Sequence, residues 1–142
     1  MPRRPATPFI ETFAGLKRRL SAVVEAAYAP LGIGATQAKL LRTVGERQPM
    51  SQADLARATG TDPALTGRLL LTLLNRGWVR RRRSREDKRA FSLELTPEGE
   101  ALYATVRAKR AALHARVEKC LDAEDREAFE RIAEKLMEAF PE

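Results

Sequence analysis

The stretch that decides the fold runs from Ser51 to Arg83 and reads SQADLARATGTDPALTGRLLLTLLNRGWVRRRR. Ser51 and Asp54 have the spacing of a capping box, which predicts that a short helix begins here. Gly60 supplies the turn after this helix. Ala56 is small enough to lie where two helices cross. These features predict a short helix that ends in a glycine turn.

A second helix is predicted directly after that turn. Asp62 is a good N-cap, and Pro63 falls at the first helical position, where its missing N–H costs nothing. The apolar pattern continues to about Asn75, and Gly77 ends the helix. Two short helices joined by a glycine turn are typical of a helix-turn-helix.

A two-stranded hairpin is predicted next. Phe91, Leu93 and Leu95 alternate with polar residues, which is the period of a half-buried strand. Residues 78–83 are the expected partner strand, and residues 84–89 are the expected tip. A basic hairpin after a helix-turn-helix predicts a winged helix-turn-helix, so the expected fold class is mainly α with a small β-wing.

Amphipathic helices are predicted on both sides of this region. The first has an apolar stripe at helical spacing, made of Phe9, Phe13, Leu16, Leu20, Val23, Val24 and Ala27. Thr36 is expected to cap the helix that follows. A long helix is predicted to begin at Thr96-Pro97, and a capping box of Asp122 and Asp125 predicts the start of the last helix.

The composition indicates one globular domain, with 142 residues, of which 44% are hydrophobic and 32% charged. No apolar run approaches the ~20 residues that cross a bilayer, and no apolar stretch follows the basic start. We therefore expect no membrane partner and no secretory signal. The single cysteine, Cys120, fits a reducing cytoplasm. Its place beside Leu121 on an apolar stripe predicts a buried structural residue rather than a redox switch.

The sequence offers little for catalysis. His114 is the only histidine, and no second histidine or cysteine lies near it, although structural zinc sites usually have four N or S ligands. Glycine-rich phosphate loops and nucleophile elbows are absent from the sequence. We therefore expect no enzyme activity, no metal and no cofactor, and we expect His114 to be a partly buried surface or interface residue.

Positive charge is concentrated between Arg76 and Arg89. Eight basic residues against two acidic residues give this segment a net charge of +6, out of +7 for the whole chain. Charge runs are usually solvated faces, but this one lies in a predicted wing, which favours double-stranded DNA as the partner. The second helix of the helix-turn-helix would enter the major groove, and the wing tip would meet phosphates or a narrow minor groove.

The stretch from Thr36 to about Leu102 resembles the MarR family of bacterial transcriptional regulators. The residues that carry the resemblance are Gln37, Leu55-Ala56, Asp62, Arg68, Asn75-Arg76-Gly77-Trp78-Val79, Asp87 with Arg89, and Leu95-Thr96-Pro97-Glu98-Gly99. The resemblance implies a homodimer in which two winged domains bind a pseudo-palindromic operator. It implies an N-terminal arm and dimerisation helix at 1–35, a winged DNA-binding domain at 36–96, and C-terminal dimerisation helices at 97–142.

The predicted DNA contacts lie at the starts of two helices and on the wing. The first turns of the second helix are expected to be exposed, with Ala64, Leu65, Thr66, Gly67 and Arg68. The other predicted contacts are Ser51, Gln52, Arg83, Arg85, Asp87, Lys88 and Arg89. Asp87 and Arg89 either contact DNA or shape the wing, and Leu65 either meets a thymine methyl or belongs to the core. Gly67 either allows close approach to DNA or is simply tolerated, at about 0.8–1 kcal/mol relative to Ala.

The resemblance also implies that a small aromatic or phenolic anion releases the DNA. Phe13 and Tyr28 are predicted walls of the ligand cavity, and alternatively they are core or dimer contacts. Lys17, Arg18 or Arg19 would meet a carboxylate, and Arg18 is the residue selected. The predicted function is that of a homodimeric, cytoplasmic, sequence-specific DNA-binding repressor. The alternative is a non-specific architectural DNA-binding protein or a protein-interaction winged helix, and the former would bind DNA with a steep salt dependence and little sequence preference.

Overall fold

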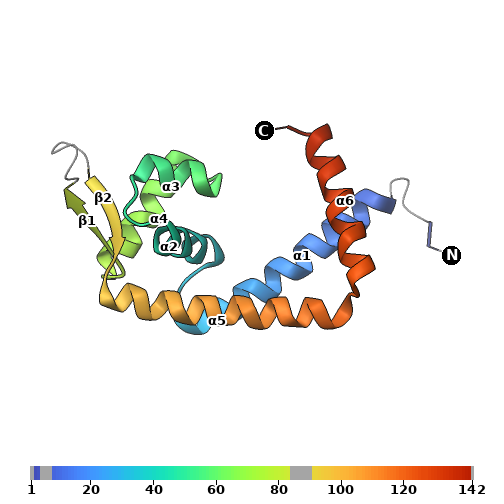
Figure 1. Cartoon of the computed structure of the whole chain (residues 1–142), viewed down its shortest axis with the longest axis horizontal. Helices are drawn as coiled ribbons and strands as arrows, with labels where there is room; N and C mark the ends of the chain where they lie inside the picture. Colours follow the sequence, from blue (N-terminus) through green and yellow to red (C-terminus); the bar gives the residue numbers. More distant parts are fainter. Residues whose placement is uncertain (1, 4–7, 84–90, 142) are drawn as a thin grey trace. The chain divides into compact units, whose positions relative to one another are not determined.

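The computed structural model describes residues 2–3, 8–83 and 91–141 (Figure 1). In chain order the elements are α1 (Pro8–Tyr28), the short 3-10 helix η1 (Ala29–Leu31), α2 (Ala35–Arg47), α3 (Gln52–Thr59), α4 (Pro63–Asn75), β1 (Val79–Arg83), β2 (Phe91–Leu95), α5 (Pro97–Cys120) and α6 (Ala123–Ala139). This order confirms the predicted helical fold with a two-stranded wing. The chain divides into two compact units, Met1–Arg107 and Ala108–Glu142. The boundary falls inside α5.

Capping explains where the helices of the first unit begin. The Leu65 N–H donates to Asp62 Oδ2 at 3.1 Å, and Pro63 follows Asp62 at the start of α4, as predicted. The N-cap of α2 is Gly34, whose N–H donates to Gln37 Oε1 at 3.1 Å. The prediction that Thr36 caps this helix is wrong, because Thr36 already lies inside it.

The core of the first unit is built around α2, which packs against α3, α4 and β2. The three helices α2, α3 and α4 lie together beside the hairpin in Figure 1. The largest fully buried apolar side chains are Leu40, Leu41, Val44, Leu55, Leu70, Leu73, Leu93 and Val106. Tyr28, at the end of α1, belongs to the same core and is 4% exposed. The winged domain therefore takes core residues from α1 and from the start of α5.

One face of the hairpin packs against this core. β1 and β2 are antiparallel, with Val79 opposite Leu95 and Arg81 opposite Leu93. Val79, Leu93 and Leu95 are buried, which confirms the predicted alternation, whereas Phe91 is exposed. Met50 extends the pairing, because the Leu93 N–H donates to its carbonyl oxygen at 2.7 Å.

The start of α5 packs tightly against the base of the wing. The Gly99 N–H donates to Thr96 Oγ1 at 3.0 Å, and the Thr96 N–H donates to the Trp78 carbonyl oxygen at 3.1 Å. A Cβ atom at Gly99 would lie 1.8 Å from that same carbonyl oxygen. Only glycine fits here, so the backbone contact fixes where α5 leaves the hairpin.

The second unit contains the end of α5 and the whole of α6. The Asp125 N–H donates to Asp122 Oδ1 at 2.8 Å, and the Asp122 N–H donates to Asp125 Oδ2 at 3.2 Å, so the predicted capping box is confirmed. Arg126 Nη1 lies 3.2 Å from Glu118 Oε1. Among residues 108–141, no side chain is buried.

Two residues of this unit are more exposed in the single chain than predicted. Cys120 is exposed rather than buried. The His114 side chain is 73% exposed, and its Nε2 lies 3.3 Å from Glu118 Oε1. Both residues lie on a helix that no buried core covers in this unit, so an apolar stripe in the sequence did not translate into burial. None of the helices in the described ranges is long and apolar enough to cross a membrane.

Candidate nucleic-acid interface

The start of α3 forms one side of the candidate interface. The Asp54 N–H donates to Ser51 Oγ at 3.0 Å, so Ser51 caps the helix. Asp54 also forms an ion pair with Arg57. Hydrogen bonds from the Arg57 side chain, and secondly from Ser51, hold the pKa of Asp54 below its ordinary value. This turn is therefore fixed locally, with Gln52 as its first helical residue.

The predicted recognition helix, α4, presents only part of its first turns. Ala64 and Arg68 are exposed, whereas Leu65 and Gly67 are partly buried. The exposed pair lies four residues apart, which places both side chains on one side of the helix. Arg68 is therefore available to a base or a phosphate, and Ala64 leaves room for close approach.

Thr66 corrects the predicted set of DNA contacts. Its side chain is 0% exposed, and its hydroxyl donates to the Asp62 carbonyl oxygen at 2.9 Å. Thr66 shares a helix face with the buried Leu70 and Leu73, four and seven residues further on. The prediction that Thr66 is an exposed contact is wrong, because a threonine hydroxyl can satisfy itself on the preceding turn of its own helix.

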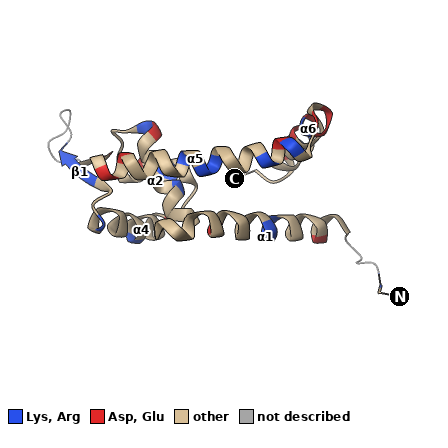
Figure 2. Cartoon of the chain, turned by 90° about the horizontal axis from the view of Figure 1, so that it is seen from below, with Lys and Arg blue, Asp and Glu red and all other residues tan. Residues whose placement is uncertain are grey.

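The arginines of β1 lie on two faces of the strand. Arg80 Nη2 and Arg82 Nη1 lie 3.3 and 3.6 Å from Glu94 Oε2. Arg81 and Arg83 lie on the opposite face, which they share with the buried Val79. Arg81 Nη2 donates to Gln52 Oε1 at 3.3 Å. The strand is basic along its exposed length (Figure 2). Glu94 offsets charge only on the face that carries Arg80 and Arg82.

Arg83 is the last residue of the wing that the structure describes before the tip. Its guanidinium carbon lies 5.8 Å from the centre of the Phe91 ring. Arg85, Asp87, Lys88 and Arg89 fall outside the described residues. The roles predicted for these four residues stay predictions.

Comparison with known proteins agrees with this arrangement. The sequence profile described as the MarR family matches residues 33–91. The HTH-type transcriptional repressor Rv2887 of Mycobacterium tuberculosis is 34% identical over 113 residues, which cover 80% of this chain and 81% of the relative. The chain belongs to the MarR family. It is accordingly a winged helix-turn-helix transcriptional regulator and not an enzyme.

Solved structures of MarR-family proteins share the fold. Rv2887 in complex with p-aminosalicylic acid has a TM-score of 0.67 and 30% identity, covering 91% of this chain and 98% of that chain. A mutant MarR from E. coli in complex with operator DNA has a TM-score of 0.80 and 24% identity, covering 92% of this chain and 94% of that chain. The second likeness shows the fold alone.

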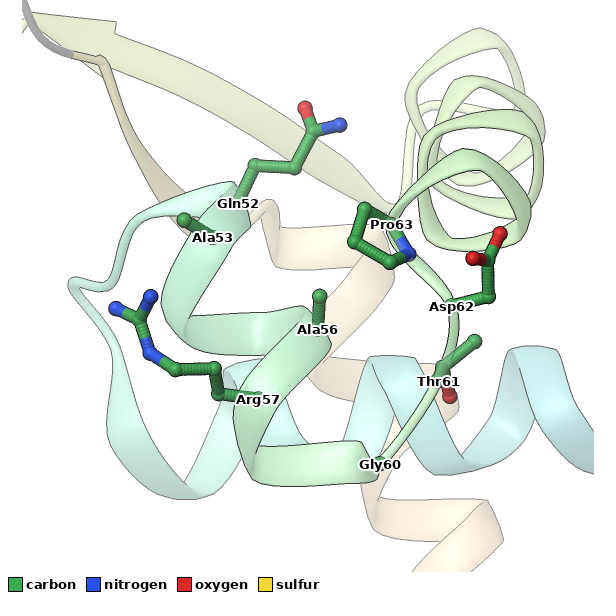
Figure 3. Close-up of a pocket in the computed structure, with 8 residues that line it drawn as sticks. All are labelled: Gln52, Ala53, Ala56, Arg57, Gly60, Thr61, Asp62 and Pro63. Atoms are coloured by element: carbon green, nitrogen blue, oxygen red, sulfur yellow. The ribbon is translucent and has the colours of Figure 1, made fainter.

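An open groove lies between α3 and the start of α4 in this MarR-family chain. Its volume is about 610 Å³, and its lining is Gln52, Ala53, Ala56, Arg57, Gly60, Thr61, Asp62 and Pro63. Figure 3 shows the small side chain of Ala56 between the two helices, as predicted for a crossing point. Gly60 has a φ of 61°, which suits glycine in the turn.

The predicted ligand residues do not come together in one protomer. Phe13 and Tyr28 lie fifteen residues apart on α1, which is about 22 Å along a helix. Phe13 is 53% exposed, whereas Tyr28 is 4% exposed within the core. Arg18 is five residues from Phe13 and therefore points to a different side of the helix. The prediction that Phe13 and Tyr28 wall a ligand cavity, with Arg18 meeting a carboxylate, stays a prediction.

Arg81 is absent from the contacts that the sequence predicts. The signal was present, because counting in twos from Val79, the first residue of β1, places Arg81 and Arg83 together on the core-side face. The contact with Gln52 could not be found in this way, since 29 residues separate the two. In residues 2–3, 8–83 and 91–141, no cluster of His, Cys, Asp or Glu could hold a metal ion.

Proposed function

We propose that this chain is a homodimeric, sequence-specific DNA-binding repressor. The observation that carries the proposal is the Gln52–Arg81 contact, because it joins the start of the helix-turn-helix to the basic strand of the wing. Two similar proteins support the proposal that the chain is a DNA-binding repressor. Rv2887 is named a transcriptional repressor, and the mutant E. coli MarR was solved with operator DNA.

The proposed DNA contacts divide by element. Arg68, Ala64 and Leu65 of α4 face the major groove, where arginine can bind guanine and an apolar side chain can meet a thymine methyl. Ser51 lies at the start of α3, against the sugar-phosphate backbone, and Gln52 beside it bonds to Arg81 of the wing. The wing adds Arg81 and Arg83, and it adds the predicted contacts at Arg85, Asp87, Lys88 and Arg89. Gly67 lies beside Gln52 and shapes this surface.

A second copy of the chain would cover apolar faces that are open here. Large apolar side chains are exposed along α1 and in and after α6, namely Phe9, Ile10, Phe13, Leu16, Leu20, Phe129, Ile132, Met137 and Phe140. Homodimer interfaces are more apolar than ordinary protein surface. The helices that flank the winged domain therefore form the dimer contact. Two winged domains related by twofold symmetry then bind a pseudo-palindrome.

The proposed effector is a small aromatic anion, because Rv2887 was solved with p-aminosalicylic acid. Such a ligand releases DNA only if it binds one geometry of the dimer more tightly than the other. If Phe13, Arg18 and Tyr28 take part, they do so in separate contacts or with residues of a second copy.

The test is a fluorescence anisotropy titration with labelled DNA from upstream of the gene. Scrambled DNA of equal length is titrated in parallel, at about 50 and about 200 mM salt. The expected result is a preference of about 10³ or more for the native fragment, with saturation at one dimer per site. Equal affinity for both DNAs, together with footprinting of genomic fragments that finds no protected sequence, would favour the architectural alternative.

A further inference from the structure

Gln52 lies where three elements of the proposed DNA-binding surface meet. It begins α3, its Oε1 accepts a hydrogen bond from Arg81 of β1 at 3.3 Å, and its Nε2 faces Gly67 of α4. In Figure 3 the Gln52 side chain extends toward the strand, whereas Arg57 points away on the other side of α3. A single side chain thus touches both the wing and the recognition helix.

A side chain at Gly67 would meet Gln52. A Cβ atom there would lie 3.3 Å from Gln52 Nε2, so the end of the Gln52 side chain would have to shift by a few tenths of an ångström. Glycine inside a helix is destabilising relative to alanine. Gly67 therefore weakens α4 at the position where its missing side chain makes room for Gln52.

The partner of Arg81 differs in kind from the partner of Arg80 and Arg82. Those two arginines face the carboxylate of Glu94, which offsets their charge. Arg81 instead donates to a neutral amide oxygen. An amide orients the guanidinium without cancelling its charge, and it leaves other N–H donors for a second acceptor. An arginine held in this way is suited to a phosphate.

We propose that Gln52 is a positioning residue that holds Arg81 as a phosphate contact, and that Gly67 provides the space for it. The proposal rests on the proposed function, since it names a contact within that DNA-binding surface. It adds that the wing strand is oriented by α3 and α4 and does not depend on the hairpin alone. It also gives Arg81 a different role from the neighbouring arginines, although all of them add the same charge to the strand.

The first test is a double-mutant cycle of Gln52→Ala and Arg81→Ala, measured by anisotropy on duplex DNA. Arg81→Ala should weaken binding about tenfold and reduce the slope of log affinity against log salt by about one. Gln52→Ala should weaken binding about three- to tenfold with the slope retained. In the Arg81→Ala background, Gln52→Ala should cost nothing further, because the residue that it positions is absent.

Arg80→Ala is the matched control, because it removes an arginine of the same strand from the face that Glu94 offsets. Its effect should be less than about twofold. A full loss from Gln52→Ala in the Arg81→Ala background would overturn the proposal, since Gln52 would then contact DNA itself. An unchanged salt slope for Arg81→Ala would also overturn it.

The second test uses Gly67→Ala, which should move stability and binding in opposite directions. The melting temperature should rise, because alanine favours the helix, while DNA affinity falls about threefold as the methyl group displaces Gln52. In the Gln52→Ala background the same change should leave affinity unaltered. An equal loss in both backgrounds would mean that the methyl group meets DNA directly, contrary to the proposal.

A separate measurement distinguishes failure of the proposed function from failure of the positioning role. Sequence preference is judged on the wild-type chain with native and scrambled DNA. The cycles are repeated on the scrambled duplex, where a phosphate contact still forms because it does not depend on sequence. Loss of preference with intact coupling would overturn only the specific-repressor assignment, whereas intact preference without coupling would overturn only the positioning role.

Discussion

In the first unit the apolar side chains of α2 and α4 close on one another, whereas in the second unit those of α6 face outward. Leu40 and Leu70 are 0% exposed, but Phe129 is 60% exposed and Phe140 is 77% exposed. Helix α1 shows both behaviours, with Tyr28 in the core and Phe13 open. One chain therefore completes the core of the winged domain but leaves apolar faces of the flanking helices uncovered.

The largest expected effect comes from placing a charge on an open face. Ile132→Glu should convert dimers to monomers, because a carboxylate cannot be buried in an apolar interface without a partner. Operator affinity should then fall roughly 10²- to 10⁴-fold, since the two half-sites are no longer bound together. Sedimentation equilibrium and anisotropy on the same samples measure both effects.

Arg131→Glu is the control for this change, because it places a carboxylate on the neighbouring exposed position. It should leave the dimer intact. If Ile132→Glu is also dimeric with unchanged affinity, the open face of α6 is not the interface, and the contrast between the two units has another cause.

The next largest effect is a difference in stability between substitutions on the buried and the exposed face of α4. Leu70→Ala should reduce the free energy of unfolding by about 2–5 kcal/mol, because it leaves a cavity in the core. Leu71→Ala makes the same chemical change at the next residue, which is 54% exposed, and should cost no more than about 0.5 kcal/mol. Urea unfolding measures both values. Similar losses at the two positions would contradict the closed core described for the winged domain.

A smaller effect concerns the start of α4. Asp62→Ala removes the acceptor of the Leu65 N–H and should reduce the free energy of unfolding by about 1 kcal/mol. Asp62→Asn keeps an acceptor oxygen and should be close to wild type in the same urea experiment. If the two variants unfold alike, the cap contributes little and the core alone sets where α4 begins.

The smallest effect is a pH dependence at Asp54. Because hydrogen bonds from Arg57 and Ser51 lower the pKa of this residue, its contribution to stability is present above the usual aspartate pKa of ~4 and is lost as the pH falls through the lower, folded-state pKa. Asp54→Asn should therefore unfold at slightly lower urea than wild type at neutral pH. The difference should disappear in strong acid, and a constant difference at all pH values would exclude this linkage.

Much of the fold follows from local sequence signals. The caps at Ser51 and Asp62, the proline at 63 and the alternation from Phe91 to Leu95 act through neighbouring residues, so a single sequence contains them. Thr66 was misplaced although its spacing to Leu70 indicated burial. A polar side chain ordinarily predicts exposure, but the Thr66 hydroxyl bonds within its own helix.

The remaining features depend on contacts between distant segments. Gln52 of α3 lies beside Gly67 of α4 and bonds to Arg81 of β1, and neither contact involves neighbouring residues in the sequence. Cys120 and His114 lie beside apolar residues at helical spacing, which predicts burial. Burial needs a second surface that covers the helix, and none of the side chains at 108–141 is buried. Helical periodicity shows which face is apolar and not what lies against it.

The contact between Gly99 and the Trp78 carbonyl oxygen leaves no clearance at the root of α5. The backbone of α5 lies so close to the hairpin here that a methyl group on residue 99 is excluded. Trp78 is also joined to α4, since its N–H donates to the Leu73 carbonyl oxygen at 3.1 Å. The first turns of α5, the base of the wing and the end of α4 are thus one mechanical joint. Any movement of the start of α5 relative to α4 would therefore have to break these backbone contacts.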